Sequence, residues 1–78
     1  MLVCTITSPA NTETYKNLKS VTLPAFSGHA QILPGHAESF LILKKGDISL
    51  KQENDQNKKI QIDGGECHIK NDTIAVIL

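Results

Sequence analysis

The chain is poor in aromatic side chains and carries no excess of charge of either sign. Its 78 residues include one Tyr, two Phe and no Trp, so aliphatic side chains must fill the interior. It has no arginine, and its lysines and carboxylates, eight of each, give a formal net charge of +0. Nucleic acids and anionic membrane surfaces attract proteins with a basic patch or stripe. We therefore expect neither nucleic-acid binding nor direct insertion into lipid.

Long hydrophobic runs are also missing. A helix that crosses a bilayer needs about 20 predominantly apolar residues, whereas the longest uninterrupted run here is Phe40-Leu41-Ile42-Leu43. The N-terminus, residues 1–5, has no basic segment before an apolar region and no arginine-rich amphipathic pattern, so no secretory signal or transit peptide is expected. These absences favour a soluble protein in a cytosolic, reducing compartment.

Cysteine is scarce, and its spacing does not fit a metal site. The chain has two cysteines, Cys4 and Cys67, and no Cys-x-x-Cys motif. A zinc site would need four ligands of matching geometry from these two residues and three scattered histidines. A disulfide between the two is open in principle, because each falls in a candidate strand. In a reducing compartment we expect two free, mostly buried thiols, and we expect no cofactor.

What the chain does have is a regular alternation of apolar and polar residues. Leu2, Cys4 and Ile6, for example, share one face of a candidate strand. A period of two indicates half-buried strands, and turn-forming residues interrupt it at short intervals. A chain of this length forms one small domain. The pattern predicts a single all-β domain over residues 1–78, a small antiparallel β-sandwich of about nine to ten short strands without a long helix.

Three of the interruptions have specific turn chemistry. Pro34-Gly35 fits the middle of a type II turn, in which Pro sets φ and Gly supplies a positive φ, and this turn displays His36. Asn71-Asp72 fits a two-residue hairpin turn, so the last two strands should pair. Gly64-Gly65 precedes a strand candidate and is too short for a phosphate loop, which favours a corner where backbones approach closely.

Two strand candidates are apolar on both faces. Residues 37–45 also fit a helical spacing, but the run is short and lies between Gly35 and Gly46, so we predict a strand. Both faces of residues 40–43 and of residues 74–78 are apolar, although an antiparallel sheet with one wet face should alternate. Either these strands are covered within the fold, or Leu41 and Leu43, or Ala75 and Ile77, belong to a protein interface.

No constellation of residues points convincingly to catalysis. His29, His36 and His68 with Glu38 and Glu66 could suggest a cupin-like metal site, but the His-x-His followed by Glu that such sites use is absent. We therefore predict a protein that is not an enzyme. A free-standing β-sandwich that binds a metal or a small ligand, possibly cupin-like, remains the alternative.

Three segments together carry a resemblance to a known family. They are Ser20-Val21-Thr22-Leu23-Pro24, Ile32-Leu33-Pro34-Gly35-His36-Ala37 and Asp63-Gly64-Gly65. This arrangement resembles the N-terminal β-sandwich of the epsilon subunit of the F-type ATP synthase, and the resemblance covers nearly the whole chain. It implies a non-catalytic central-stalk subunit that links the gamma subunit to the c-ring, so that ion flow is coupled by rotation to ATP synthesis. Such a complex lies at the cytoplasmic face of the bacterial inner membrane.

The resemblance also implies two sets of contact residues. The gamma-facing set comprises Ser8, His36, Leu41 and Leu43, and the c-ring-facing set is the predicted loop Gly28, His29, Ala30 and Gln31. The chain departs from the family pattern in that loop, where an acid is replaced by His29. A salt bridge to a basic c-ring loop is therefore not available in its usual form.

A last expectation concerns nucleotide. In the family, a C-terminal helical hairpin follows the sandwich, and it blocks ATP hydrolysis or holds ATP. The sequence printed here ends at Leu78, within the last strand candidate. From the resemblance we expect this chain neither to bind ATP nor to act as an extended-helix brake.

Overall fold

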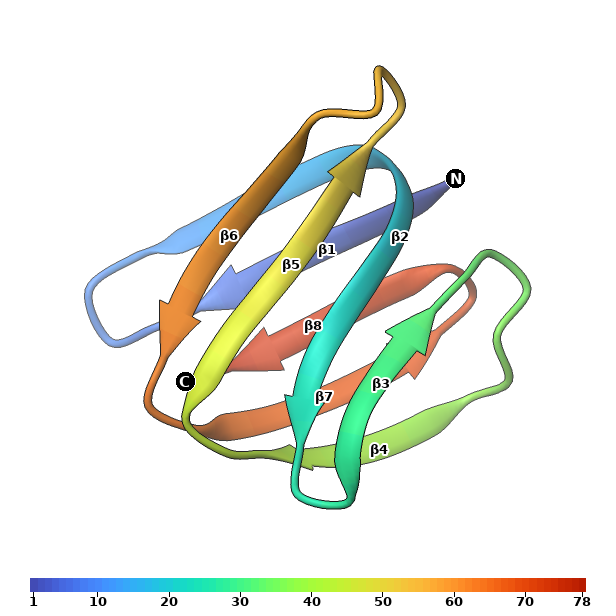
Figure 1. Cartoon of the computed structure of the whole chain (residues 1–78). Coiled ribbons are helices and arrows are strands. Elements are labelled where there is room, and N and C mark those ends of the chain that lie inside the picture. Colours follow the sequence, from blue (N-terminus) through green and yellow to red (C-terminus); the bar gives the residue numbers. More distant parts are fainter.

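The computed structural model describes all 78 residues, and its regular structure consists of β-strands alone, which confirms the all-β prediction (Figure 1). No helical segment with the length and hydropathy needed to cross a bilayer is present. The strands are β1 (Leu2–Thr7), β2 (Thr12–Ala25), β3 (Gly28–Ile32), β4 (Ser39–Leu43), β5 (Gly46–Gln52), β6 (Asn57–Ile62), β7 (Gly65–Lys70) and β8 (Thr73–Ile77).

There are eight strands, fewer than the nine or ten expected, because residues 12–25 form one long strand that bends. Asn17 has a φ of 58°, a left-handed conformation that Asn tolerates better than most residues. The ladder to β5 shifts register between Leu18 and Ser20. The bend lets the first part of β2 pair with β1 and the second part pair with β5 and β3. The single strand β2 therefore contributes to both layers of the sandwich.

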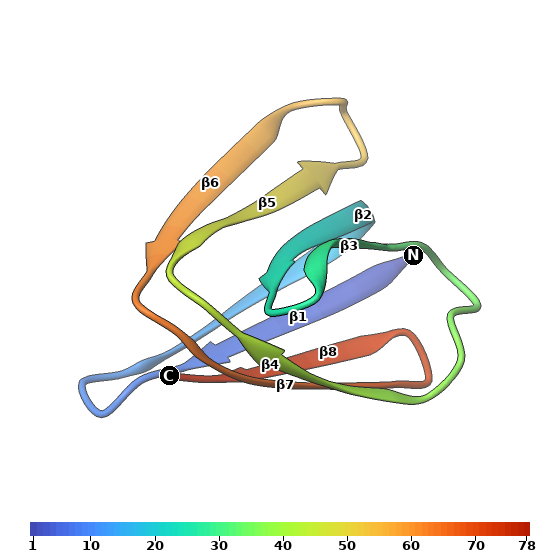
Figure 2. The ribbon, with the colours of Figure 1, turned by 60° about the horizontal axis from the view of Figure 1, so that its bottom comes forward.

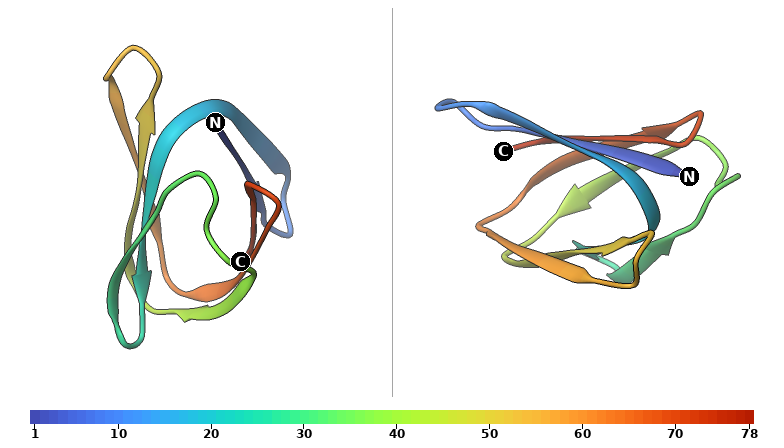
Figure 3. Two further views of the ribbon diagram at one scale, coloured as in Figure 1. Left: turned by 90° about the vertical axis from the view of Figure 1, so that its right-hand side faces the viewer. Right: turned by 90° about the horizontal axis from the view of Figure 1, so that it is seen from above.

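The two layers are visible when the molecule is turned (Figures 2 and 3). One layer contains β1, β8, β7 and β4 in that order, and the other contains β3, the second part of β2, β5 and β6. All strand pairs are antiparallel except β1 with β8, which is parallel. Only one residue pair, Ala25 with Leu43, joins β2 to β4. The edge of β4 that does not pair with β7 is therefore largely unpaired.

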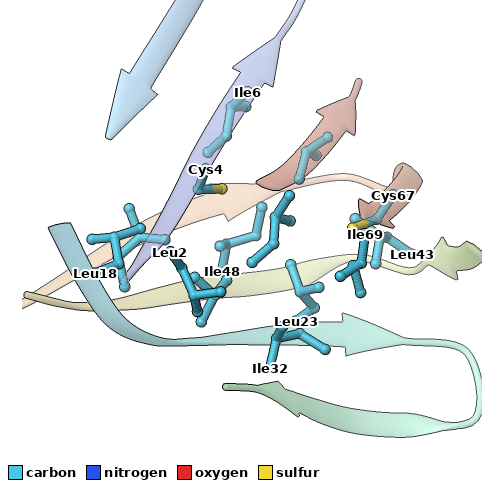
Figure 4. Packing of buried hydrophobic residues seen from close by; sticks show 14 of the residues in the cluster. Leu2, Cys4, Ile6, Leu18, Leu23, Ile32, Leu43, Ile48, Cys67 and Ile69 are labelled. Carbon is cyan, nitrogen blue, oxygen red and sulfur yellow. The ribbon is translucent and has the colours of Figure 1, made fainter. Parts of the chain in front are cut away.

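The core lies between the layers and is aliphatic, as the composition requires. The hydrophobic cluster contains 15 buried residues, and strands from both layers supply them (Figure 4). Burial alternates along β1, where Leu2, Cys4 and Ile6 are buried and the residues between them are half-buried. Both cysteines belong to this cluster as free thiols, which confirms that expectation. No buried side-chain nitrogen or oxygen lacks a hydrogen-bond partner, so the core contains no uncompensated polar group.

The predicted turns are present. Gly35 has a φ of 84°, and the His36 amide donates to the carbonyl of Leu33 over 3.2 Å, as a type II turn over Pro34-Gly35 requires. Asn71 and Asp72 have φ values of 51° and 60°, and they connect β7 to β8 in the predicted hairpin. The segment 37–45 contains the strand β4, as predicted.

Candidate functional site

One face of the sandwich leaves apolar side chains in contact with solvent. In the layer β1-β8-β7-β4, Phe40 and Ile42 of β4 are 71% and 56% exposed, and Ile77 of β8 is 49% exposed. Cross-strand pairing forms two rows across the layer, Phe40-His68-Ala75 and Ile42-Glu66-Ile77. We call the patch formed by these side chains the outer face; its residues are Phe40, Ile42, Glu66, His68, Ala75 and Ile77.

A stacked aromatic pair organises the outer face. The rings of Phe40 and His68 lie 4.4 Å apart between centroids and 7° from parallel. His68 Nε2 also lies 2.9 Å from the Glu38 carboxylate, so the imidazole holds both a neighbouring ring and the carboxylate that precedes β4. The His68 side chain is 36% exposed. Because the hydrogen bond to Glu38 restrains the His68 ring, the stacking contact in turn orients the ring of Phe40 on the surface.

A single unpaired carboxylate lies among these apolar side chains. Glu66 is exposed and lies between Ile42 on β4 and Ile77 on β8. The charged pair Lys19 with Asp55 and the hydrogen bond of His68 with Glu38 both involve other residues, so the carboxylate of Glu66 has no ion-pair partner. A shallow hollow of about 260 Å³ opens here, lined by Phe40, Glu66, Cys67, His68, Ala75 and Ile77. The outer face is thus apolar with one free negative charge, and it contains no group arranged for catalysis.

Two of the residues expected to face gamma point the other way. Leu43 is 2% exposed and belongs to the core (Figure 4). Leu41 is half-buried and packs against that core. Leu43 therefore offers no free side chain to a partner, and the expectation for it is corrected. Residues 40–43 of this strand are all apolar, so the sequence pattern could not tell which side would face inward. The exposed side chains of β4 are those of Phe40 and Ile42.

Ser8 and His36 are accessible, but they lie at opposite ends of the outer face. Ser8 follows β1 directly after Thr7, which pairs with Ile77, and its hydroxyl lies 3.3 Å from the carbonyl of Asn11. His36 lies in the turn before the N-terminal end of β4, and its side chain is exposed. Since β4 runs in the same direction as β1, this is the end of the layer opposite to Ser8. The structure does not bring the two residues together. The outer face lies between them.

The four residues expected to form the c-ring loop are not a loop. Gly28 to Gln31 belong to β3, which pairs with the end of β2, and the turn before it consists of Phe26 and Ser27. His29 and Gln31 are exposed, whereas Ala30 packs against the core. Strand pairing with an apolar segment of β2 gives these largely polar residues their extended conformation, which their own pattern does not predict.

Phe26 was not singled out from the sequence, although it is 69% exposed at the tip of the β2–β3 hairpin. Its amide donates to the carbonyl of Ile42 over 3.0 Å, so the tip lies beside the end of β4. A large apolar residue beside Ser27 and Gly28 in a predicted turn could have identified Phe26 as an exposed contact residue.

The remaining reactive side chains form no site. Burial raises the pKa of the Cys4 thiol to about 12, with a contribution from nearby Cys67, and burial alone raises the pKa of Cys67 to about 11. Both thiols therefore remain protonated and unreactive near neutral pH. His29, His36 and His68 lie on different elements, and nowhere do three His, Cys, Asp or Glu side chains come close enough to hold a metal ion.

Comparison with known proteins identifies the family of this chain. Residues 1–78 match the family model described as the β-sandwich domain of the ATP synthase delta/epsilon chain. The chain is 30% identical over 76 residues to the ATP synthase epsilon chain of Wolinella succinogenes, covering 97% of this chain and 56% of the relative. It is 37% identical over 60 residues to the epsilon chain of Campylobacter jejuni subsp. doylei, covering 77% and 46%. The chain thus spans about half the length of these relatives.

Solved structures show the same fold. A chain in the mitochondrial ATP synthase of Euglena gracilis, in a structure of its OSCP/F1/c-ring, superposes with a TM-score of 0.86 at 18% identity, covering 97% of this chain and 49% of that one. A chain of the central stalk/c-ring of the Tetrahymena thermophila mitochondrial ATP synthase superposes with a TM-score of 0.79 at 12% identity, covering 97% and 61%.

Proposed function

The chain belongs to the family of the β-sandwich domain of the ATP synthase delta/epsilon chain, and from this premise we propose that it is a non-catalytic subunit of the central stalk. In this role it links the gamma subunit to the c-ring, so that ion flow through the membrane sector is coupled by rotation to ATP synthesis. The complex would hold it at the cytoplasmic face of a bacterial inner membrane. Its task is mechanical, and interface area is what that task requires.

The observation that carries the proposal is the outer face. Phe40 and Ile42 expose large apolar side chains on a flat layer of paired strands. Interfaces of this kind combine a buried apolar centre with a polar rim. Ser8 and His36, which the family resemblance assigns to gamma, lie at the two ends of this face. One partner that contacts both of them would also cover the apolar side chains between, and we assign the outer face to gamma.

The c-ring would meet a different part of the sandwich, the β2–β3 hairpin. Its tip, Phe26 and Ser27, is exposed, and His29 and Gln31 of β3 also point to solvent. The polar loops of a c-ring could pack against Phe26 and accept hydrogen bonds from His29. The two partner surfaces would therefore lie on different parts of one continuous sheet, which connects them.

A pair of variants separates the two assignments. In the variant Phe40→Ser/Ile42→Ser the centre of the outer face becomes polar, and loss of a central apolar anchor should weaken binding of the isolated gamma subunit at least about tenfold. In Phe26→Ser the hairpin tip changes, and gamma binding should stay unchanged while association with the c-ring weakens. Calorimetric titration measures the first effect, and co-purification with detergent-solubilised c-ring measures the second. Unchanged gamma affinity in a folded Phe40→Ser/Ile42→Ser protein would show that the outer face is not the gamma surface.

A further inference from the structure

The connection that carries His36 is held to the rest of the fold at only two points. It runs from Leu33 to Glu38 between β3 and β4, and all of its residues are exposed. Within it, the His36 amide bonds to Leu33 and His36 Nδ1 lies 2.7 Å from the carbonyl of Ala37. Apart from a bond with the neighbouring Ser39, two contacts tie this connection down: Gly35 N–H to Asp72, and Glu38 to His68.

Apolar packing adds little to these two contacts, which we call the tethers of the connection. A polar hollow of about 510 Å³ lies beside the turn, and its lining contains no hydrophobic side chain: Gly35, His36, Glu38, Lys70, Asn71 and Asp72. A turn that borders such a hollow gains little from apolar burial, so its position depends on its hydrogen bonds. Of the two contacts that tie the connection to the rest of the fold, the one made by Gly35 is nearer to His36 in the sequence.

Asp72 is well placed to act as an anchor. The backbone amide of Gly35 donates to Asp72 Oδ1 over 2.7 Å, a short distance typical of a hydrogen bond to a charged acceptor. The carbonyl of Asp72 in turn accepts a hydrogen bond from the amide of Val3 over 3.0 Å. Asp72 also lies in the turn between β7 and β8. One residue therefore connects the Pro34-Gly35 turn to β1 and to the β7–β8 hairpin.

We propose that Asp72 is a positioning residue for partner binding: its carboxylate fixes the Pro34-Gly35 turn and thereby the place of His36 at the end of the outer face. The effect on binding rests on the proposed function, because it assumes that gamma contacts His36. Without the carboxylate the turn still closes through its own bond between Leu33 and His36, but it can move as a unit. A partner must then order it on binding, which weakens affinity without removing any direct contact.

The structure offers a substitution that isolates this effect. Asp72 has a φ of 60°, which glycine adopts readily, and Asp72→Gly gives the hairpin turn the sequence Asn-Gly that two-residue turns favour. The variant removes the carboxylate while preserving the hairpin. Asp72→Asn keeps an Oδ1 acceptor at the same place and should rescue the tether. Asn71→Gly changes the neighbouring turn residue, which has a φ of 51°, and serves as the matched control.

The test has two measurements on the whole chain. By NMR, Asp72→Gly should shift the Gly35 amide resonance and speed its hydrogen exchange by at least about tenfold, with the melting temperature unchanged or raised. By calorimetry, its affinity for the isolated gamma subunit should fall by roughly five- to tenfold. Asp72→Asn and Asn71→Gly should remain near the wild-type values in both measurements.

The two measurements distinguish failure of this proposal from failure of the proposed function. Unchanged Gly35 exchange in Asp72→Gly would overturn the tether, and faster exchange with unchanged gamma affinity would overturn its role in binding. If the wild-type chain does not bind gamma at all, the proposed function and the binding role fail together. The Gly35 exchange then still decides whether Asp72 positions the turn.

Discussion

Replacement of Gly65 by alanine tests the close backbone approach at the start of β7. Gly65 has a φ of 153°, and a Cβ atom built on it would lie 2.5 Å from the carbonyl oxygen of Ile77 and 3.2 Å from a methyl carbon of Leu78. The first distance is well below the 3.0 Å under which real Cβ atoms essentially never approach another atom. Alanine would therefore force β7 and β8 apart, next to the pair formed by Glu66 and Ile77.

The magnitude follows from two terms. A non-glycine residue in this backbone conformation costs on the order of 1–3 kcal/mol. Displacing the neighbouring strand weakens one or two ladder hydrogen bonds, each worth about 1 kcal/mol. We expect Gly65→Ala to lower the free energy of unfolding by about 2–5 kcal/mol. A domain of this size has roughly 4–12 kcal/mol in total, so the variant should be severely destabilised.

Gly28 provides the matched control. Its φ is 122°, but nothing lies within 4 Å of its Cβ position, so Gly28→Ala carries the backbone strain without the clash. Urea unfolding followed by far-UV circular dichroism measures both variants, since the chain has no tryptophan for fluorescence. We expect Gly28→Ala to cost only the strain term, about 1–3 kcal/mol. Equal losses for the two variants would refute the argument that the contact with Ile77 matters.

Four further predictions concern the core and the bend of β2. Because burial raises the pKa of Cys4 from 9.0 to about 12 and that of Cys67 from 9.0 to about 11, the folded state holds these protons more tightly than the unfolded state. The contribution of these thiols to the free energy of unfolding should be fully present below pH 9 and be lost as the pH rises toward 11 and 12. Urea midpoints measured across this pH range should fall, and they should fall less steeply in Cys4→Ala. A thiol reagent at pH 8 should label both cysteines only after denaturation, and rapid labelling of the native chain would contradict their burial. Leu23→Ala should cost about 2–5 kcal/mol by urea unfolding, because Leu23 is fully buried; a cost below 1 kcal/mol would mean that the core closes over the cavity. At Asn17, where φ is 58°, alanine should cost about 1 kcal/mol and glycine close to none, and equal costs would show that the bend imposes no conformational demand.

Local sequence patterns are enough to predict the fold class and the chemistry of the turns. An alternation such as that of Leu2, Cys4 and Ile6 can bury one face only as a strand, so the all-β class follows from a local period. Pro34-Gly35 and Asn71-Asp72 likewise adopt their turns because their own backbone preferences match them. The family resemblance, too, depended on local motifs, and the comparison with known proteins confirmed it.

The tertiary structure decided which side of each ambiguous strand faces the core. Every side chain from Phe40 to Leu43 is apolar, so the choice between an inward Leu43 and an outward Phe40 was made by packing against the opposite layer. The extended conformation of Gly28 to Ile32 comes from pairing with β2, and the parallel contact of β1 with β8 joins the two ends of the chain. The tether from Asp72 to Gly35 is of the same kind. Each of these features depends on residues far apart in sequence, and only the assembled sandwich brings such residues into contact.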